Sequence, residues 1–188
     1  MDLMVSTELS HQAPWQLATH KESPDLLGAT RDLLLQGLSL LFELNDRQYS
    51  ERSSRPFRAS IGQHYSQVLW HFQRLVLGLR SGEFEYKRGE RNTRTETEVT
   101  YACIATCDIL RALKRLSAAG LWRECRVSDT SSFSSIAKSE IAREMAYCMR
   151  NTIGHFTIIK VLCTSAGIKL PPEFGNLPPM PEKDFQSS

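Results

Sequence analysis

Residues 141–163 read IAREMAYCMRNTIGHFTIIKVLC, and the apolar positions of this stretch decide the fold. These positions recur in alternating steps of four and three residues, which is typical of a helix whose inward face packs against other helices. The inward series is Ile141, Met145, Cys148, Thr152, His155, Ile159 and Leu162. Ser139 is a candidate cap for this helix. Gly167 is expected to end it, because the proline-rich residues 170–179 cannot continue a helix.

Three more helices are expected upstream. The first begins at Ser23-Pro24-Asp25, where a capping residue precedes a proline, and ends near Asn45. The second opens at Ser60 and closes at Gly82, and the third runs from about Thr93 to Ala119, with Gly120 as its stop. The polar residues 46–56, 81–92 and 128–135 are interpreted as connectors. No convincing strand alternation is present, so the sequence predicts an all-α four-helix bundle.

Length and composition favour a single domain. The 188 residues suffice for one hydrophobic core, and we expect a flexible lead-in over residues 1–23, the bundle domain over 24–180, and a flexible tail over 181–188. The proline-rich segment lies at the end of the bundle domain.

Charge and hydropathy exclude several classes of protein. The 23 basic and 21 acidic residues are spread along the chain, which argues against a nucleic-acid-binding protein. The apolar runs are far shorter than the roughly 20 residues that span a bilayer, and Asp2 stands where a signal peptide carries positive charge. Five scattered cysteines suggest reduced thiols. We therefore expect a cytoplasmic protein that does not act at a membrane.

Polar side chains on two of the expected helices point to a site. His155 lies on the inward face, with Asn151 one turn before it, and His64, Gln67 and His71 share one flank of the second helix. If the two helices are neighbours, these groups can converge. Neutral imidazoles suit zinc, nickel or iron(II), whereas amides are poorer ligands. The alternatives are a metal-free polar pocket or a histidine that only makes a structural hydrogen bond.

Other residues offer weaker candidates for chemistry. Cys148 can form a nucleophilic set with Asn151 and His155. Glu144 lies two turns before Asn151 and can act as a base, orient another group or pair with a neighbouring cation. The connector contains a tyrosine and several basic residues that could bind an anionic substrate, but a solvated basic loop is the favoured interpretation: Tyr86, Arg88, Arg91 and Arg94.

A set of short motifs resembles the DinB-like superfamily of metal-binding four-helix bundles. The motifs are Ser60-Ile-Gly-Gln-His64, then Tyr86 with Arg91 and Glu96, then Arg143-Glu144-Met145, Ile153-Gly-His155-Phe, and Phe174-Gly175. Their order and spacing extend over about residues 25–180. The resemblance implies a bundle that holds a divalent metal through one histidine on the second helix and a His-x-x-x-His pair on the fourth. Members include thiol-dependent isomerases, transferases and hydrolases, and many are dimers.

The chain departs from that pattern at the ligand positions. Asn151 stands at the first position of the fourth-helix pair, and Gly154 stands where relatives often have another histidine. The second-helix ligand aligns either with His64 or with Gln67. The implied metal set is therefore His64, Asn151 and His155, or Gln67 in place of His64. Either set predicts a weakened or lost metal site.

Two functions remain open from the sequence. In one, the protein is a DinB-like enzyme acting on a small molecule, with His155 as ligand or general acid and base, His64 as its partner, and Asn151 and Gln67 as polarising donors. In the other, it is a non-catalytic binding or scaffold protein that retains the bundle. The resemblance allows a homodimer in both cases.

Overall fold

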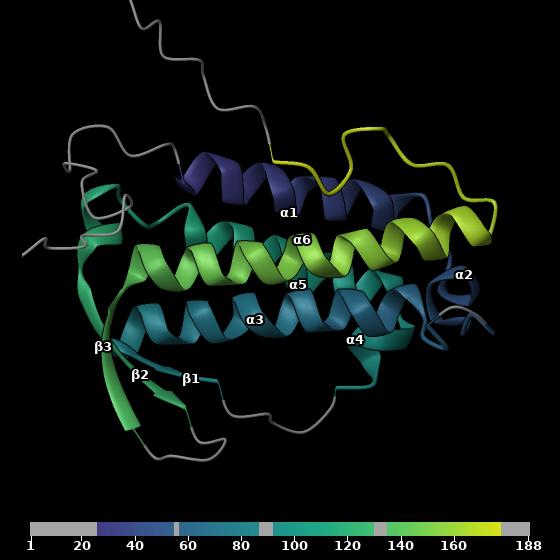
Figure 1. Cartoon of the computed structure of the whole chain (residues 1–188). Helices are drawn as coiled ribbons and strands as arrows, with labels where there is room; N and C mark the ends of the chain where they lie inside the picture. Colours follow the sequence, from purple (N-terminus) through teal and green to yellow (C-terminus); the bar gives the residue numbers. More distant parts are fainter. Residues whose placement is uncertain (1–25, 55–56, 87–91, 130–134, 178–188) are drawn as a thin grey trace, which may run out of the picture.

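The computed structural model describes residues 26–54, 57–86, 92–129 and 135–177. This part of the chain is mostly helical and carries one small sheet. Its long helices are α1 (Leu26–Phe42), α3 (Ile61–Ser81), α5 (Val99–Leu113) and α6 (Ile141–Ser165). In Figure 1, α3 and α6 run side by side across the front, α5 lies behind them, and α1 lies along the upper side. The expected helical character is thus confirmed, while residues 1–25 and 178–188 lie outside the described residues.

Helix α3 begins and ends as the sequence predicts. The Ser60 side chain accepts a hydrogen bond from the backbone of Gln63, whose side chain in turn accepts one from the Ser60 backbone. This reciprocal cap satisfies two backbone donors that a helix start leaves unpaired. At the other end, Gly82 adopts φ 74°, a left-handed conformation that favours glycine. These two residues fix where α3 begins and ends.

Helix α6 carries the predicted inward series. Ile141, Met145, Cys148, Thr152 and Ile159 are fully buried, and Leu162 is nearly so. His155 is the exception, since it is only half-buried. Ser139 is not the cap of this helix, contrary to the expectation from the sequence. Glu140 occupies the cap position, and the Ser139 hydroxyl donates to Glu144 at 2.6 Å.

The third expected helix is interrupted. The structure has a short helix α4 (Arg94–Thr97), an extended residue Glu98, and then α5, which ends at Leu113 rather than near Ala119. Gly120 lies inside a single 3₁₀ turn, η2 (Ala119–Trp122), and does not act as a stop. The break at Glu98 brings Thr95 close to Tyr49, whose hydroxyl donates to the Thr95 carbonyl at 2.7 Å. Tertiary contacts thus override a locally continuous helical pattern.

The small sheet was not expected from the sequence. Strand β1 (Glu83–Glu85) pairs in parallel with β2 (Glu124–Asp129), which pairs antiparallel with β3 (Ser135–Glu140). The register places Phe84 beside Val127, and Phe84 is 1% exposed, although residues 81–92 read as a polar connector. Strands of three to six residues are too short to give a distinct alternation of apolar and polar residues. The sheet lies at one end of the helices, beside the start of α6 (Figure 1).

The segment between α1 and α3 is also more ordered than expected. Helix α1 ends at Phe42, and Asn45 begins a new short helix, α2 (Asp46–Ser50), with a reciprocal cap to Gln48. The segment predicted as a loop over residues 46–56 thus contains a helix, which places Tyr49 in the core at 0% exposure.

The chain turns back after α6. Gly167 adopts φ 71°, in agreement with its predicted role at the helix end. The following segment returns along α1 and α6, drawn in yellow in Figure 1. Phe174 stacks on Phe156 with ring centroids 4.7 Å apart, and the Gln36 side chain bonds the backbones of Gly175 and Asn176. This segment therefore anchors α6 next to His155.

Candidate functional site

The two histidines named from the sequence meet between α3 and α6. Nδ1 of His64, in the first turns of α3, lies 3.1 Å from Nδ1 of His155 on α6. The ring centroids are 5.4 Å apart, and both side chains are half-buried. Phe57 contacts His64 edge-on at 6.5 Å. The predicted convergence of the second and last helices is thus present for this pair.

Burial keeps both rings neutral. Desolvation lowers the pKa of His64 from its ordinary value of 6.5. Desolvation, followed by the charge of His64, lowers the pKa of His155 to about 4. Two imidazolium ions at this separation would repel each other, so near neutral pH the pair exists as two uncharged rings.

The contact between two Nδ1 atoms determines how the protons are arranged. A neutral imidazole carries one N–H and one lone pair. For the contact to be a hydrogen bond, one ring must donate from Nδ1 and the other must accept at Nδ1. The donor ring then has a bare Nε2, and the acceptor ring has an Nε2–H. One pair therefore offers both a proton acceptor and a proton donor.

A third histidine lies close by and is more buried than the sequence suggested. His71 is 8% exposed, and its Nδ1 has no hydrogen-bond partner among the described residues. Desolvation, followed by the charge of His155, lowers its pKa to about 4. Its ring lies edge-on to Trp70 at 4.8 Å and to Tyr147 at 5.6 Å. In the sequence, the seven-residue spacing between His64 and His71 indicated that both lie on the same flank of the helix.

The two amides behave differently from the histidines. Gln67 is exposed. Asn151 is half-buried, and its Nδ2 donates to the Tyr147 carbonyl one turn earlier in the same helix at 2.9 Å. One donor of the amide is thus engaged with the backbone of its own helix.

The donor set does not fit a tight metal site. Among the described residues, no group of three or more His, Cys, Asp or Glu side chains is placed to hold an ion. Catalytic zinc sites commonly use three such ligands. Here two imidazole nitrogens converge, and the third candidate is an amide, which is a poor ligand for these ions.

A second polar cluster lies nearer the sheet. Glu144 is 7% exposed and accepts hydrogen bonds from the Tyr86 hydroxyl at 2.7 Å and the Ser139 hydroxyl at 2.6 Å. Cys148 lies beside it, and burial raises the pKa of its thiol to about 12. Its Sγ is 3.6 Å from the His71 carbonyl. A protonated, buried thiol is a poor nucleophile, so Cys148 is unsuited to the nucleophilic set considered from the sequence.

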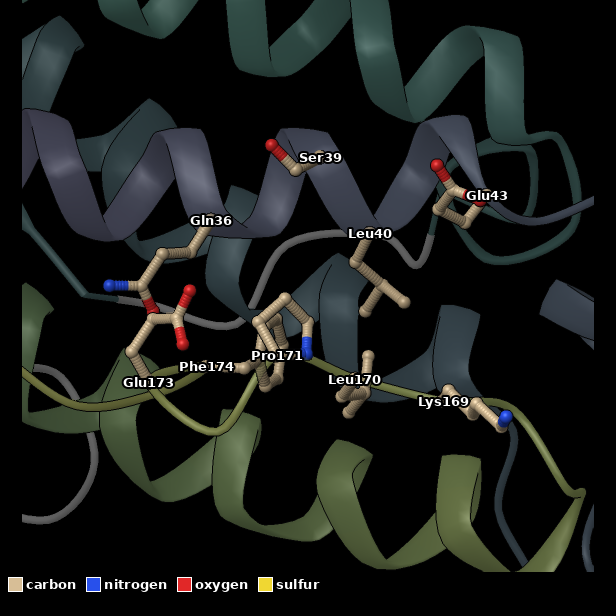
Figure 2. A pocket seen from close by; sticks show the side chains of 9 residues that line it. All are labelled: Gln36, Ser39, Leu40, Glu43, Lys169, Leu170, Pro171, Glu173 and Phe174. Carbon is tan, nitrogen blue, oxygen red and sulfur yellow. The ribbon is translucent and has the colours of Figure 1, made fainter.

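A cavity of about 500 Å³ lies away from the histidines, between α1 and the C-terminal segment. Figure 2 shows Leu40, Leu170 and Pro171 at its centre, with Glu43 and Glu173 toward opposite ends. None of the three histidines lines it.

No helix in the described ranges combines the length and apolar character needed to cross a membrane.

The arrangement of these elements is that of a DinB-like fold. The structure is similar to the crystal structure of a DinB-like protein from Bacillus subtilis, YjoA. The TM-score is 0.56 at 16% sequence identity, and the alignment covers 78% of this chain and 95% of that chain. No family model and no curated protein matches the sequence. At this identity the likeness establishes the fold alone.

Proposed function

We propose that this protein is a divergent DinB-like four-helix bundle that catalyses proton transfer on a small molecule. The main observation that supports this proposal is the 3.1 Å contact between Nδ1 of His64 and Nδ1 of His155. Proton transfer by a positioned histidine typically contributes a rate acceleration of roughly 10²–10⁴-fold. The pair places a proton acceptor next to a proton donor, which favours an isomerase or another proton-shifting reaction over group transfer.

The relay follows from the tautomers. The bare Nε2 of the donor ring takes a proton from the substrate, and the Nδ1 proton of that ring passes across the 3.1 Å contact. The second ring then returns its own Nε2 proton to another atom of the substrate. The proton count is unchanged after each cycle, and both rings end as the opposite neutral tautomer. Burial supports this scheme because it keeps either ring from storing a permanent charge.

In this proposal the divalent metal of the DinB-like pattern is weakened or lost. Two neutral imidazoles can still attract zinc, nickel or iron weakly, with Asn151 as the third position. The protein is proposed to be cytoplasmic, and a homodimer is compatible with it. Metal titration of the full chain tests this part. We expect binding of Zn²⁺ or Ni²⁺ no tighter than the micromolar range, and stoichiometric nanomolar binding would overturn it.

Catalysed deuterium incorporation tests the activity. Purified protein is incubated in D₂O with a panel of small carbon acids, such as oxo acids and aldoses, and exchange is followed by NMR. We expect the wild type to label at least one compound, and His64→Gln and His155→Gln each to lose at least about 100-fold of that rate. Gln67→Ala, on the exposed flank, is the matched control. No exchange across the panel, or exchange that survives both histidine changes, contradicts the proposal.

The alternative is a non-catalytic binding or scaffold protein. The observation in its favour is that Gln67 is exposed and that Asn151 bonds its own helix, so the four polar groups do not act together. Reaction of the histidines with diethyl pyrocarbonate separates the two functions. Rapid modification of His64 and His155 in the folded protein supports an accessible site, and full protection favours the scaffold.

A further inference from the structure

A second cavity has a composition that suits a different ligand. It measures about 490 Å³ and lies between the first turns of α1 and the end of α5. That volume is within the range of small-molecule sites. Its apolar wall consists of leucines from both elements: Leu27, Leu35, Leu110, Leu113 and Leu116. Leu35 is 37% exposed, so part of this wall faces solvent.

All charged residues that line this cavity are basic. Arg31 comes from α1, and Arg111 and Lys114 come from the end of α5. Arg111 bonds Asp108 at 2.6 Å, whereas neither Arg31 nor Lys114 makes an ion pair with a described residue. Cations at the end of α5 also complement its helix dipole, but that effect does not favour a cation near the start of α1. Arg31 and Lys114 are both exposed, so their charged groups are accessible to a ligand.

The cavity between α1 and the C-terminal segment provides a contrast within the same molecule. It also has an apolar centre, yet its charged residues are Glu43, Glu173 and Lys169. The two faces of α1 thus present cavities of similar size and different charge. Of these two cavities, the α1/α5 cavity is the one that combines leucines with an uncompensated pair of cations.

We propose that the α1/α5 cavity binds a free medium-chain fatty acid. The acyl chain lies on the leucines, where burial of its apolar surface favours binding. The carboxylate lies against Arg31 and Lys114, which supply charge-assisted hydrogen bonds. This site is separate from the histidine pair and does not depend on the proposed proton transfer.

Calorimetric titration of the full chain with decanoate, below its micellar concentration, tests this inference. We expect one saturable site. Replacing Arg31→Glu and Lys114→Glu together should weaken binding at least tenfold. Arg52→Glu with Arg150→Glu makes the same change in net charge on exposed residues that do not line the cavity, and should leave affinity within twofold. Circular dichroism of both double variants verifies that they remain folded.

Three further ligands complete the experiment. Hexanoate should bind at least tenfold more weakly because its chain is shorter, and decan-1-ol should do so because it lacks the charge. Vesicles of anionic phospholipid should not sediment the protein, since a free acid is the ligand. The inference is overturned if decanoate does not saturate, if decan-1-ol binds equally well, if both double variants lose affinity alike, or if vesicles bind instead.

Discussion

Two polar clusters involve residues of α6, and they differ in how many of their polar atoms have hydrogen-bond partners. Near the sheet, both carboxylate oxygens of Glu144 accept a hydroxyl hydrogen bond, from Tyr86 and from Ser139. Farther along the helices, His64 and His155 have each other at 3.1 Å, and the Nδ1 of His71 has no described partner. The first cluster is complete, whereas the second retains atoms that can exchange protons.

This difference distinguishes polar groups that only support the fold from polar groups that can take part in a reaction. A buried polar group with all its partners in place stabilises one conformation and has little left to offer a ligand. A group held neutral by burial, with unused donors and acceptors, costs stability and is more often found at functional sites. On this basis we propose the histidine cluster as the site. The Glu144 cluster links Tyr86 and Ser139 to α6.

The largest effect is expected where α3 approaches α4, two residues before His64. A Cβ at Gly62 would overlap the backbone carbonyl of Glu96, and a backbone atom cannot move aside. Gly62→Ala should therefore cost more than about 3 kcal/mol of unfolding free energy. The measurement is urea unfolding. If the variant folds, NMR should show the His64–His155 contact disturbed and the Tyr86–Glu144 bond kept. A cost below about 1 kcal/mol would mean that α3 and α4 do not approach this closely.

The next effect is the pH dependence of the histidine end. His71 and His155 have pKa values near 4 in the folded protein, against 6.5 as the ordinary value. The unfolded chain binds more protons between these values, so the free energy of unfolding should fall as pH drops from about 6.5 to 4. The loss is at most about 3 kcal/mol per histidine.

Urea unfolding at pH 7, 5.5 and 4.5 measures that slope. His71→Phe removes the contribution of one histidine and should make this slope shallower. It should also remove the buried Nδ1 that has no described partner. Tyr86→Phe, at the other cluster, serves as the control and should leave the slope between pH 7 and 5.5 unchanged. An equal slope in the wild type and His71→Phe would mean that His71 titrates normally.

A smaller loss is expected when the Glu144 cluster loses one partner. Tyr86→Phe leaves one carboxylate oxygen without its donor and should cost about 1–2 kcal/mol at pH 7. Ser139→Ala should cost a similar amount, and the double variant should show coupling because both hydroxyls serve one carboxylate. Chemical denaturation of the four proteins measures this. Fully neutral single changes would show that Glu144 does not depend on these hydroxyls.

The smallest effect is a gain next to the histidine pair. Gly154 lies in α6, and a Cβ added there would meet no described atom within 4 Å, so alanine can be accommodated. Gly154→Ala should stabilise the protein by about 0.5–1 kcal/mol through helix propensity. Thermal unfolding measures the gain, and the His64–His155 contact should persist. Destabilisation would indicate that this face of α6 is covered by a surface that the described residues do not include.

The sequence predicts the long helices well where side chains cap them. Ser60, Gly82 and Gly167 carry their signals in the local sequence, and the inward series of α6 follows from periodicity. The break at Glu98 and the strand around Phe84 depend on tertiary partners, Tyr49 and Val127 among them, which lie about 40 or more residues away along the chain. No local pattern contains that information.

The site was predictable in part for the same reason. His64 and His155 occupy helix faces that periodicity identifies, so their approach could be expected. Their separation, the tautomers that follow from it and the burial of His71 depend on how α3 and α6 pack. Gln67 stands only one turn from His64 and is exposed, and helical spacing alone does not distinguish the two positions.

Nitrogen-15 NMR of the imidazole rings in the full chain tests the central claim most directly. We predict that at pH 7 one of His64 and His155 carries its proton on Nδ1 and the other on Nε2. Both should titrate below the ordinary pKa of 6.5, with the pKa of His155 at about 4. Two rings that both carry the proton on Nε2 and titrate independently near 6.5 would contradict the neutral pair and the proton relay built on it.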